Sequence, residues 1–213
     1  MRGTMLVTRP RHDDTTYYLF HWAQEIIQLA KKKGVKIFDL AKERANRKEL
    51  ESVAAKMQPS FIFLNGHGNA NCVAGCDNEP LIKAGDNEKI LERKSVYALS
   101  CSSAKKLGPA SVKAGAKVYM GYEDDFMFMY EPDKLSKPLE DKTAKLFLGP
   151  SNQLVISFLK GHTAGEARER SQNYFMENIQ KLISSDSSDS DMAQYLLWDK
   201  MHQVCLGDKD TVI

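Results

Sequence analysis

Short apolar runs and amphipathic segments alternate over the first 122 residues, and this alternation constrains the fold more than any other feature. The apolar runs predict strands at residues 5–8, 35–40, 61–64, 96–99 and 117–122. The amphipathic segments predict helices at residues 17–33, 47–57 and 104–114. Strands that alternate with helices are typical of βαβ units, which build a mostly parallel sheet with helices on both faces. We therefore expect an α/β fold.

The second half of the chain is predicted to be mainly helical. Helices are expected at residues 139–148, 152–159, 163–183 and 192–204, with a polar Ser/Asp run at 184–191 that indicates a mobile loop. Residues 70–93 break the earlier alternation and predict a hairpin or excursion loop beside the third strand. A length of 213 residues with 42% apolar residues suits one domain, 1–213, with an α/β core at 1–126 and a helical part at 127–213.

Composition excludes several classes of function. Lys and Arg total 30 against 28 Asp and Glu, so there is no broad positive field for nucleic acid or anionic lipid. The sequence lacks a signal-type apolar region and a run of about 20 apolar residues for a membrane span. Four cysteines are too few for a disulfide-rich secreted scaffold. We expect a cytoplasmic protein with free thiols, no nucleic acid partner and no membrane partner.

His67 and Cys101 are the residues whose positions point to chemistry. Each directly follows an apolar strand, and the carboxyl ends of parallel strands converge on one rim of a sheet. A cysteine attacks as the thiolate, and a nearby imidazole can take its proton. Gly66 and Gly68 flank the histidine, so the amide of Gly68 can approach a substrate closely. Together with the amide of Cys101 it is predicted to form an oxyanion hole.

Three blocks around these residues resemble a known family. Residues 61–69 (FIFLNGHGN), 97–108 (YALSCSSAKKLG) and 115–126 (GAKVYMGYEDDF) resemble the catalytic blocks of caspase-like (clan CD) cysteine peptidases, nearest to separases and CHAT domains. The resemblance covers roughly residues 5–126, and 161–171 (GHTAGEARERS) is similar to bacterial members. It implies a caspase-hemoglobinase-like fold and an endopeptidase with His67 and Cys101 as its dyad. No metal and no organic cofactor is implied.

The resemblance also suggests where a substrate residue is recognised. Members that cut after Arg or Lys place acidic residues in the loop after the first strand or after the strand that follows the cysteine. Asp13 and Asp14 fit the first place, and Glu123, Asp124 and Asp125 fit the second. Metacaspase-like members also carry an acidic residue just before the cysteine, where this chain has Leu99 and Ser100. Arg9 and Arg11 would instead suit an acidic substrate residue, but we favour a basic one.

Other interpretations of the same residues are weaker but remain open. His67, Cys72, Cys76 and Cys101 carry zinc-type ligands, yet the Cys72-x3-Cys76 spacing is loose and lacks a partner CxxC. A phosphate-binding turn at Gly66–Gly68 lacks a G-x-G-x-x-G or P-loop sequence. A catalytically silent or latent module would act by binding a regulatory protein partner. Cys205 is expected to be a core residue of the last helix. The expected partner is a protein or peptide substrate.

Overall fold

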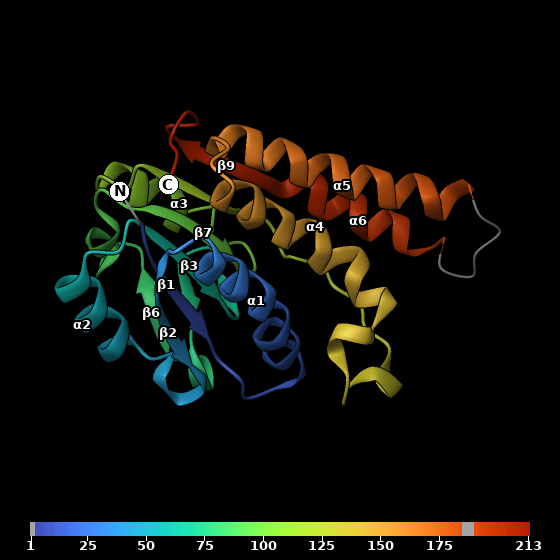
Figure 1. The fold of residues 1–213 in the computed structure, drawn as a ribbon, viewed down its shortest axis with the longest axis horizontal. Coiled ribbons are helices and arrows are strands. Elements are labelled where there is room, and N and C mark those ends of the chain that lie inside the picture. Colours follow the sequence, from blue (N-terminus) through green and yellow to red (C-terminus); the bar gives the residue numbers. More distant parts are fainter. Residues whose placement is uncertain (1–2, 185–189) are drawn as a thin grey trace.

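A six-stranded sheet forms the centre of the computed structural model, which describes residues 3–184 and 190–213. Its strand order is β2-β1-β3-β7-β8-β9 (Figure 1). The bounds are β1 Thr4–Arg9, β2 Lys36–Ala41, β3 Phe61–Asn65, β7 Ser95–Leu99, β8 Val118–Tyr122 and β9 Gln203–Gly207. In this sheet β2, β1, β3, β7 and β8 are parallel to one another, and β9 runs antiparallel to β8. The predicted α/β fold with a mostly parallel sheet is confirmed.

Helices cover both faces of this sheet. The helices are α1 Asp14–Lys32, α2 Arg47–Met57, α3 Leu107–Lys113, α4 Lys142–Leu159, α5 Ala164–Ser184 and α6 Met192–His202. Successive strand residues point to opposite faces. Met5 and Val7 join a core with α1, α4 and the start of α5, whereas Leu6 joins a second core with α2 and α3. A third cluster joins α4, α5 and α6. Figure 1 shows α5 and α6 side by side beyond the sheet.

The excursion after the third strand is a small antiparallel sheet. Its strands are β4 Gly68–Asn69, β5 Cys72–Ala74 and β6 Pro80–Lys83. Short 3-10 helices lie at Lys42–Arg44, Cys76–Asn78, Glu88–Leu91, Pro132–Lys134 and Pro138–Glu140. Val73, Leu81 and Ile82 are buried in the second core, so the excursion packs against the main sheet. The hairpin predicted within 70–93 is present, and its sheet begins directly after His67.

The sequence predicted two helices, at 139–148 and 152–159, where the structure has the single helix α4, so the predicted interruption at 149–151 was wrong. Helix α4 continues through Pro150, although a proline cannot donate a backbone hydrogen bond to the carbonyl four residues earlier. That carbonyl belongs to Leu146, and it accepts instead from Nδ2 of Asn178 in α5 (2.9 Å). A side chain distant in sequence therefore satisfies the group that the proline leaves open. The predicted start at residue 139 was also early, since Asp141 is the N-cap of α4.

The last predicted helix was too long. Helix α6 ends at His202, and the residues from Gln203 form strand β9. Cys205 is buried as predicted but pairs with Met120 in the sheet instead of lying in a helix. Strand pairing with β8 overrides the local helical pattern here, as tertiary context commonly does. Most of the loop predicted at 184–191 lies outside the described residues.

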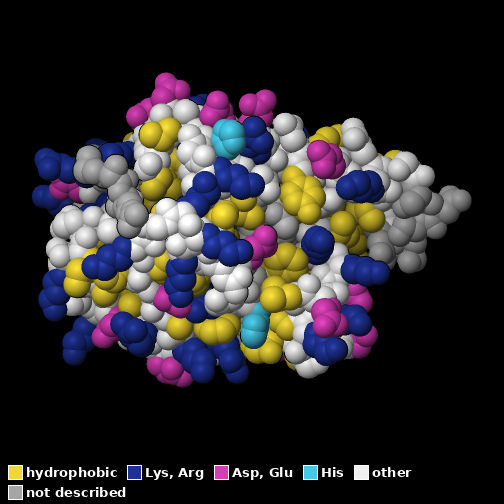
Figure 2. All heavy atoms as spheres, viewed as in Figure 1, with side chains coloured by type: hydrophobic (Ala, Val, Ile, Leu, Met, Phe, Trp, Pro, Cys, Tyr) yellow, Lys and Arg dark blue, Asp and Glu magenta, His cyan; other side chains and the backbone are white. Residues whose placement is uncertain are grey.

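The surface carries both signs of charge. On the face shown in Figure 2, Lys and Arg side chains are interspersed with Asp and Glu. Among the residues that the structure describes, no helix combines the length and the apolar character that crossing a membrane requires.

Candidate active site

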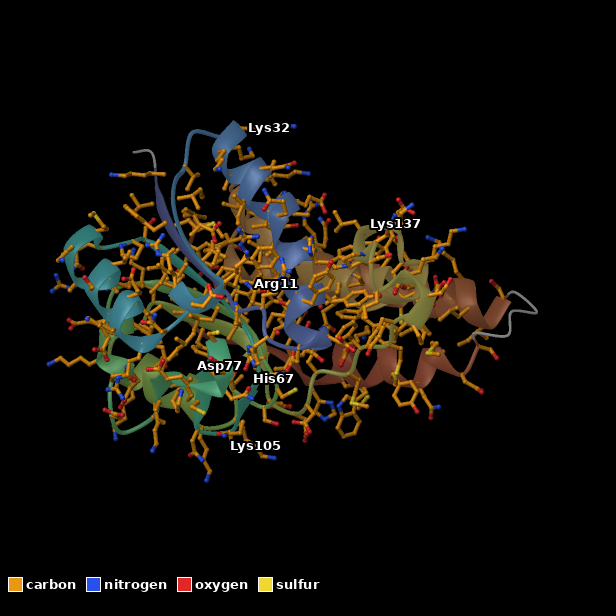
Figure 3. The ribbon with its side chains drawn as sticks, turned by 90° about the horizontal axis from the view of Figure 1, so that it is seen from below. Arg11, Lys32, His67, Asp77, Lys105 and Lys137 are labelled. Atoms are coloured by element: carbon orange, nitrogen blue, oxygen red, sulfur yellow. The ribbon has the colours of Figure 1, made fainter. Side chains whose placement is uncertain are left out.

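Three neighbouring strands end at the candidate site. β1, β3 and β7 are adjacent and parallel, so their carboxyl ends lie at one rim of the sheet. The segments that follow them carry Asp13, His67 and Cys101, respectively. Figure 3 shows His67 near the N-terminal end of α1, on the side where the strands end. Residues separated by up to 88 positions in sequence are thus gathered by the strand order.

The backbone around His67 packs directly against the segment that holds Cys101. Ser100 Oγ donates to the carbonyl oxygen of His67 (3.0 Å). A Cβ atom at Gly68 would lie 2.0 Å from Ser100 Oγ and 3.2 Å from the Cys101 carbonyl oxygen. Only glycine fits so close an approach. Gly66 is required for a different reason, because its φ of +146° is rarely adopted by other residues.

His67 is held by a carboxylate. Its Nε2–H donates to Asp13 Oδ2 (2.6 Å). Asp13 is also the N-cap of α1 and forms a capping box with Thr16. Partial burial pushes the pKa of Asp13 upward, but hydrogen bonds from Thr16 and His67 outweigh it and lower that pKa. The carboxylate therefore stays ionised and orients the imidazole, with the other ring nitrogen available for a reacting group.

The thiol of Cys101 is half-buried. Its Sγ lies 3.8 Å from the carbonyl oxygen of Phe126. Burial raises the pKa of the Cys101 thiol, and the nearby carboxyls of Asp125 and Asp199 raise it further. The thiol is therefore protonated at rest, and nucleophilic attack requires a base.

A pocket of about 640 Å³ lies next to the Asp13–His67 pair. It is lined by Arg11, His12, Asp13, Asp14, Tyr17, Pro132, Asp133, Leu135 and Ser136. Asp14 accepts a hydrogen bond from Tyr130 Oη (3.1 Å). Arg11 is exposed at the pocket, but Arg9 is buried and paired with Asp39, so Arg9 is not available to a substrate. The three carboxylates outnumber the one guanidinium.

Asp124 and Asp125 hold the loop after β8 against the segment that follows Cys101. Ser102 donates through its amide to the Asp124 carbonyl (2.9 Å) and through Oγ to Asp125 Oδ1 (2.7 Å). The indole of Trp198 donates to the Asp125 carbonyl (2.9 Å). Both aspartates are thus engaged in loop contacts, while Asp13 and Asp14 line the pocket.

Two residues near the site had no role in the sequence prediction. His12 lies beside His67, with ring centroids 6.0 Å apart. Asp199 of α6 is fully buried, and its Oδ1 accepts from the Met127 amide (2.8 Å). The D-D-T-T run that caps α1 is visible in the sequence, but the pairing of Asp13 with His67 across 54 positions is not.

Comparisons with known proteins support the fold. The chain is similar to the crystal structure of the Arg-specific cysteine proteinase gingipain R, with a TM-score of 0.64, 11% identity, and coverage of 99% of this chain and 47% of that one. It is also similar to the complex of pro- and mature domains of the same proteinase from Porphyromonas gingivalis, with a TM-score of 0.62, 10% identity, and coverage of 100% and 48%.

These two structures place the fold in the caspase-like class. At this identity the similarity establishes the fold, and the chain spans about half the length of the proteins it matches. No family model and no curated protein matches the sequence.

Proposed function

We propose that the protein is a cysteine endopeptidase in which Cys101 is the nucleophile and His67 the general base. The observation that carries this proposal is the convergence of Asp13, His67 and Cys101 at the ends of three adjacent parallel strands. A nucleophile, a base and a group that orients the base form the arrangement on which covalent acyl transfer depends.

The proposed reaction follows from the protonation states of these groups. His67 takes the proton of Cys101 as the sulfur attacks the scissile carbonyl, and it then gives that proton to the leaving amine. The amides of Gly68 and Cys101 hold the oxyanion. Water then hydrolyses the thioester, with His67 acting as base again. Asp13 stabilises the imidazolium that forms between these steps.

We further propose that the residue before the cut is basic. The pocket beside His67 contains Asp13, Asp14 and Asp133 against Arg11, so its charges favour a substrate cation. Gingipain R, which shares the fold, is an Arg-specific proteinase, and this agrees with the choice of a basic residue. An acidic substrate residue at Arg11 is the alternative.

Cleavage of fluorogenic peptides with Arg, Lys or Asp before the cut tests the proposal. Because general acid–base catalysis contributes about 10²- to 10⁴-fold, we expect Cys101→Ala and His67→Ala to lose at least that factor in kcat/KM. The matched controls are Cys205→Ala, whose thiol is buried in β9, and His162→Ala, whose imidazole pairs with Glu166 on the surface.

The second candidate is a latent or silent module that acts by binding a regulatory protein. The raised pKa of the half-buried Cys101 thiol favours this candidate, since a protonated thiol is unreactive until a base is engaged. Equal rates for all four variants and the wild type would exclude the dyad. Absence of both cleavage and labelling of Cys101 by a peptide electrophile would favour the module.

A further inference from the structure

His12 is a partly buried imidazole whose two ring nitrogens are shielded from solvent. Its side chain is 13% exposed, and among the described residues neither ring nitrogen has a hydrogen-bond partner. A neutral imidazole carries one donor and one acceptor, and buried polar groups of this kind are normally satisfied. The residue lies in the loop between β1 and α1, at the same rim as His67. Ring nitrogens that are shielded from water and have no hydrogen bond are suited to binding a ligand.

His12 belongs to a group of ligand-type atoms. One atom each from His12, Asp13 and His67 lies within 4.8 Å of the others. Asp13 Oδ2 is the centre of the group, 2.6 Å from His67 Nε2 and 3.7 Å from His12 Nε2. A tetrahedral zinc ion with bonds of about 2.0–2.1 Å needs its ligand atoms about 3.4 Å apart. Small side-chain rotations therefore suffice to bring the three atoms onto one ion.

We propose that His12, Asp13 and His67 bind one zinc-type divalent ion, which blocks the imidazole of His67. Two imidazoles and a carboxylate are ligands that zinc prefers, whereas magnesium and calcium prefer oxygen alone. Three protein ligands leave a fourth position for water. An ion on Nε2 requires the proton of the neutral imidazole to reside on Nδ1, so His67 has no free lone pair to accept the proton of Cys101 and the ion inhibits the enzyme. Binding of the ion does not depend on the proposed peptidase function, whereas inhibition by the ion rests on it.

A second group of three possible ligands also contains His12, and it is the main alternative site for the ion. His12, Cys76 and Asp77 also bring one ligand atom each within 4.8 Å of the others. Figure 3 shows Asp77 close to His67, near the start of α1. A third alternative is an ion bound by Cys101 and His67, which any Cys/His dyad can offer. The geometry favours the first trio because its carboxylate already contacts both imidazoles.

Zinc titration of the Cys101→Ala variant, followed by calorimetry, measures binding without the catalytic thiol. We expect one equivalent per chain. Changing even an outer partner of a ligand costs about 10- to 100-fold in metal affinity, so loss of a ligand in His12→Gln should weaken binding by at least about 100-fold. His162→Gln in the same background is the control, and circular dichroism checks that each variant is folded. Absence of binding, or equal affinity in His12→Gln, would overturn the proposal.

Two further variants separate the alternatives. Loss of binding in Cys76→Ser with retention in Asp13→Asn would assign the ion to the second trio and overturn the proposal. Binding by the wild type that Cys101→Ala abolishes would assign the ion to the dyad, with the same consequence. Zinc inhibition of peptide cleavage is measured on His12→Gln and His162→Gln made in the protein that retains Cys101, each against its own zinc-free rate, and we expect inhibition to weaken in His12→Gln. If the wild type cleaves nothing, the peptidase proposal fails while the binding result stands.

Discussion

Asp13 has two roles, and mutations can separate them. It caps α1 and it orients His67. Asparagine caps a helix as well as aspartate does, whereas alanine does not. We therefore expect Asp13→Asn to keep its stability but to lower kcat, because an amide cannot stabilise the imidazolium, and to raise KM for a basic substrate only modestly, because Asp14 and Asp133 remain in the pocket. Asp13→Ala should lower kcat and also lose about 1 kcal/mol of unfolding free energy.

Steady-state kinetics and urea unfolding on both variants check this separation. If Asp13→Asn retains the wild-type kcat, Asp13 has only a capping role. If KM rises instead of kcat falling, Asp13 belongs to the substrate pocket, as the sequence first suggested.

Asp199 carries a buried carboxyl with an unmatched oxygen. Among the described residues its Oδ2 has no hydrogen-bond partner, and burial raises its pKa well above the ordinary value. A raised pKa in the folded state means that the stability is fully present below pH about 3.9 and is lost as pH rises toward the folded pKa. Between pH about 3.9 and the folded pKa, the wild type should lose up to about 1.4 kcal/mol of unfolding free energy per pH unit. Asp199→Asn has no carboxyl to ionise, so it should not show this loss.

Urea unfolding between pH 4 and pH 8 measures this difference. Asp210→Asn, at an exposed position near the C-terminus, is the control and should follow the wild type. Parallel curves for Asp199→Asn and the wild type would show that the carboxyl ionises freely in the folded protein.

At this scale the sequence identified the residues of the proposed dyad but not their neighbours. His67 and Cys101 were found because each follows an apolar strand, which is a local signal. The pairing of Asp13 with His67 and the position of Asp199 depend on strand order and on how α6 docks. No local pattern encodes such distant contacts, so the sequence placed Asp13 in the pocket without its contact to His67 and gave Asp199 no role.

At the scale of elements, a contact between α4 and α5 explains why α4 is one continuous helix where the sequence predicted two. Asn178→Ala should leave the Leu146 carbonyl buried without a partner, at a cost of about 1–3 kcal/mol in unfolding free energy. In a Pro150→Ala background the restored amide can satisfy that carbonyl, so the same change should cost less.

A double-mutant cycle by chemical denaturation measures this coupling. Because the two residues serve one carbonyl, we expect an interaction energy of about 1 kcal/mol. Additive effects would mean that Asn178 stabilises α4 in some other way.

The elements that the sequence predicted well are those whose pattern is local and repeated. Helix α1 has its apolar stripe, its Asp13 cap and its terminal lysines within one segment. Strand β9 has no such signal, because its five residues continue directly from α6 and become a strand through pairing with β8. The sequence pattern predicts a helix or strand that is stabilised by its own residues. It fails for an element that is stabilised by a partner distant in sequence.

At the scale of the whole molecule, the last 22 residues bind back onto the half of the chain that contains His67 and Cys101. β9 pairs with β8 over five residues, and the indole of Trp198 and the carboxyl of Asp199 hold the loop after Tyr122. Figure 1 shows the chain returning from α6 to the edge of the sheet. β9 also covers a strand edge that would otherwise be open to aggregation.

We therefore expect the molecule to survive a cut between α5 and α6. A protease recognition sequence inserted within 185–189 should yield two fragments that elute together in native gel filtration and separate only in denaturant. Labelling of Cys101 by a peptide electrophile should persist, because the contacts of α6 with the loop after β8 are unchanged. A chain that ends at Ser184 should instead be insoluble, since β8 and the third cluster lose their cover. Release of the C-terminal fragment in native buffer would show that the covalent connection, and not the packing of α6 and β9, keeps this half in place.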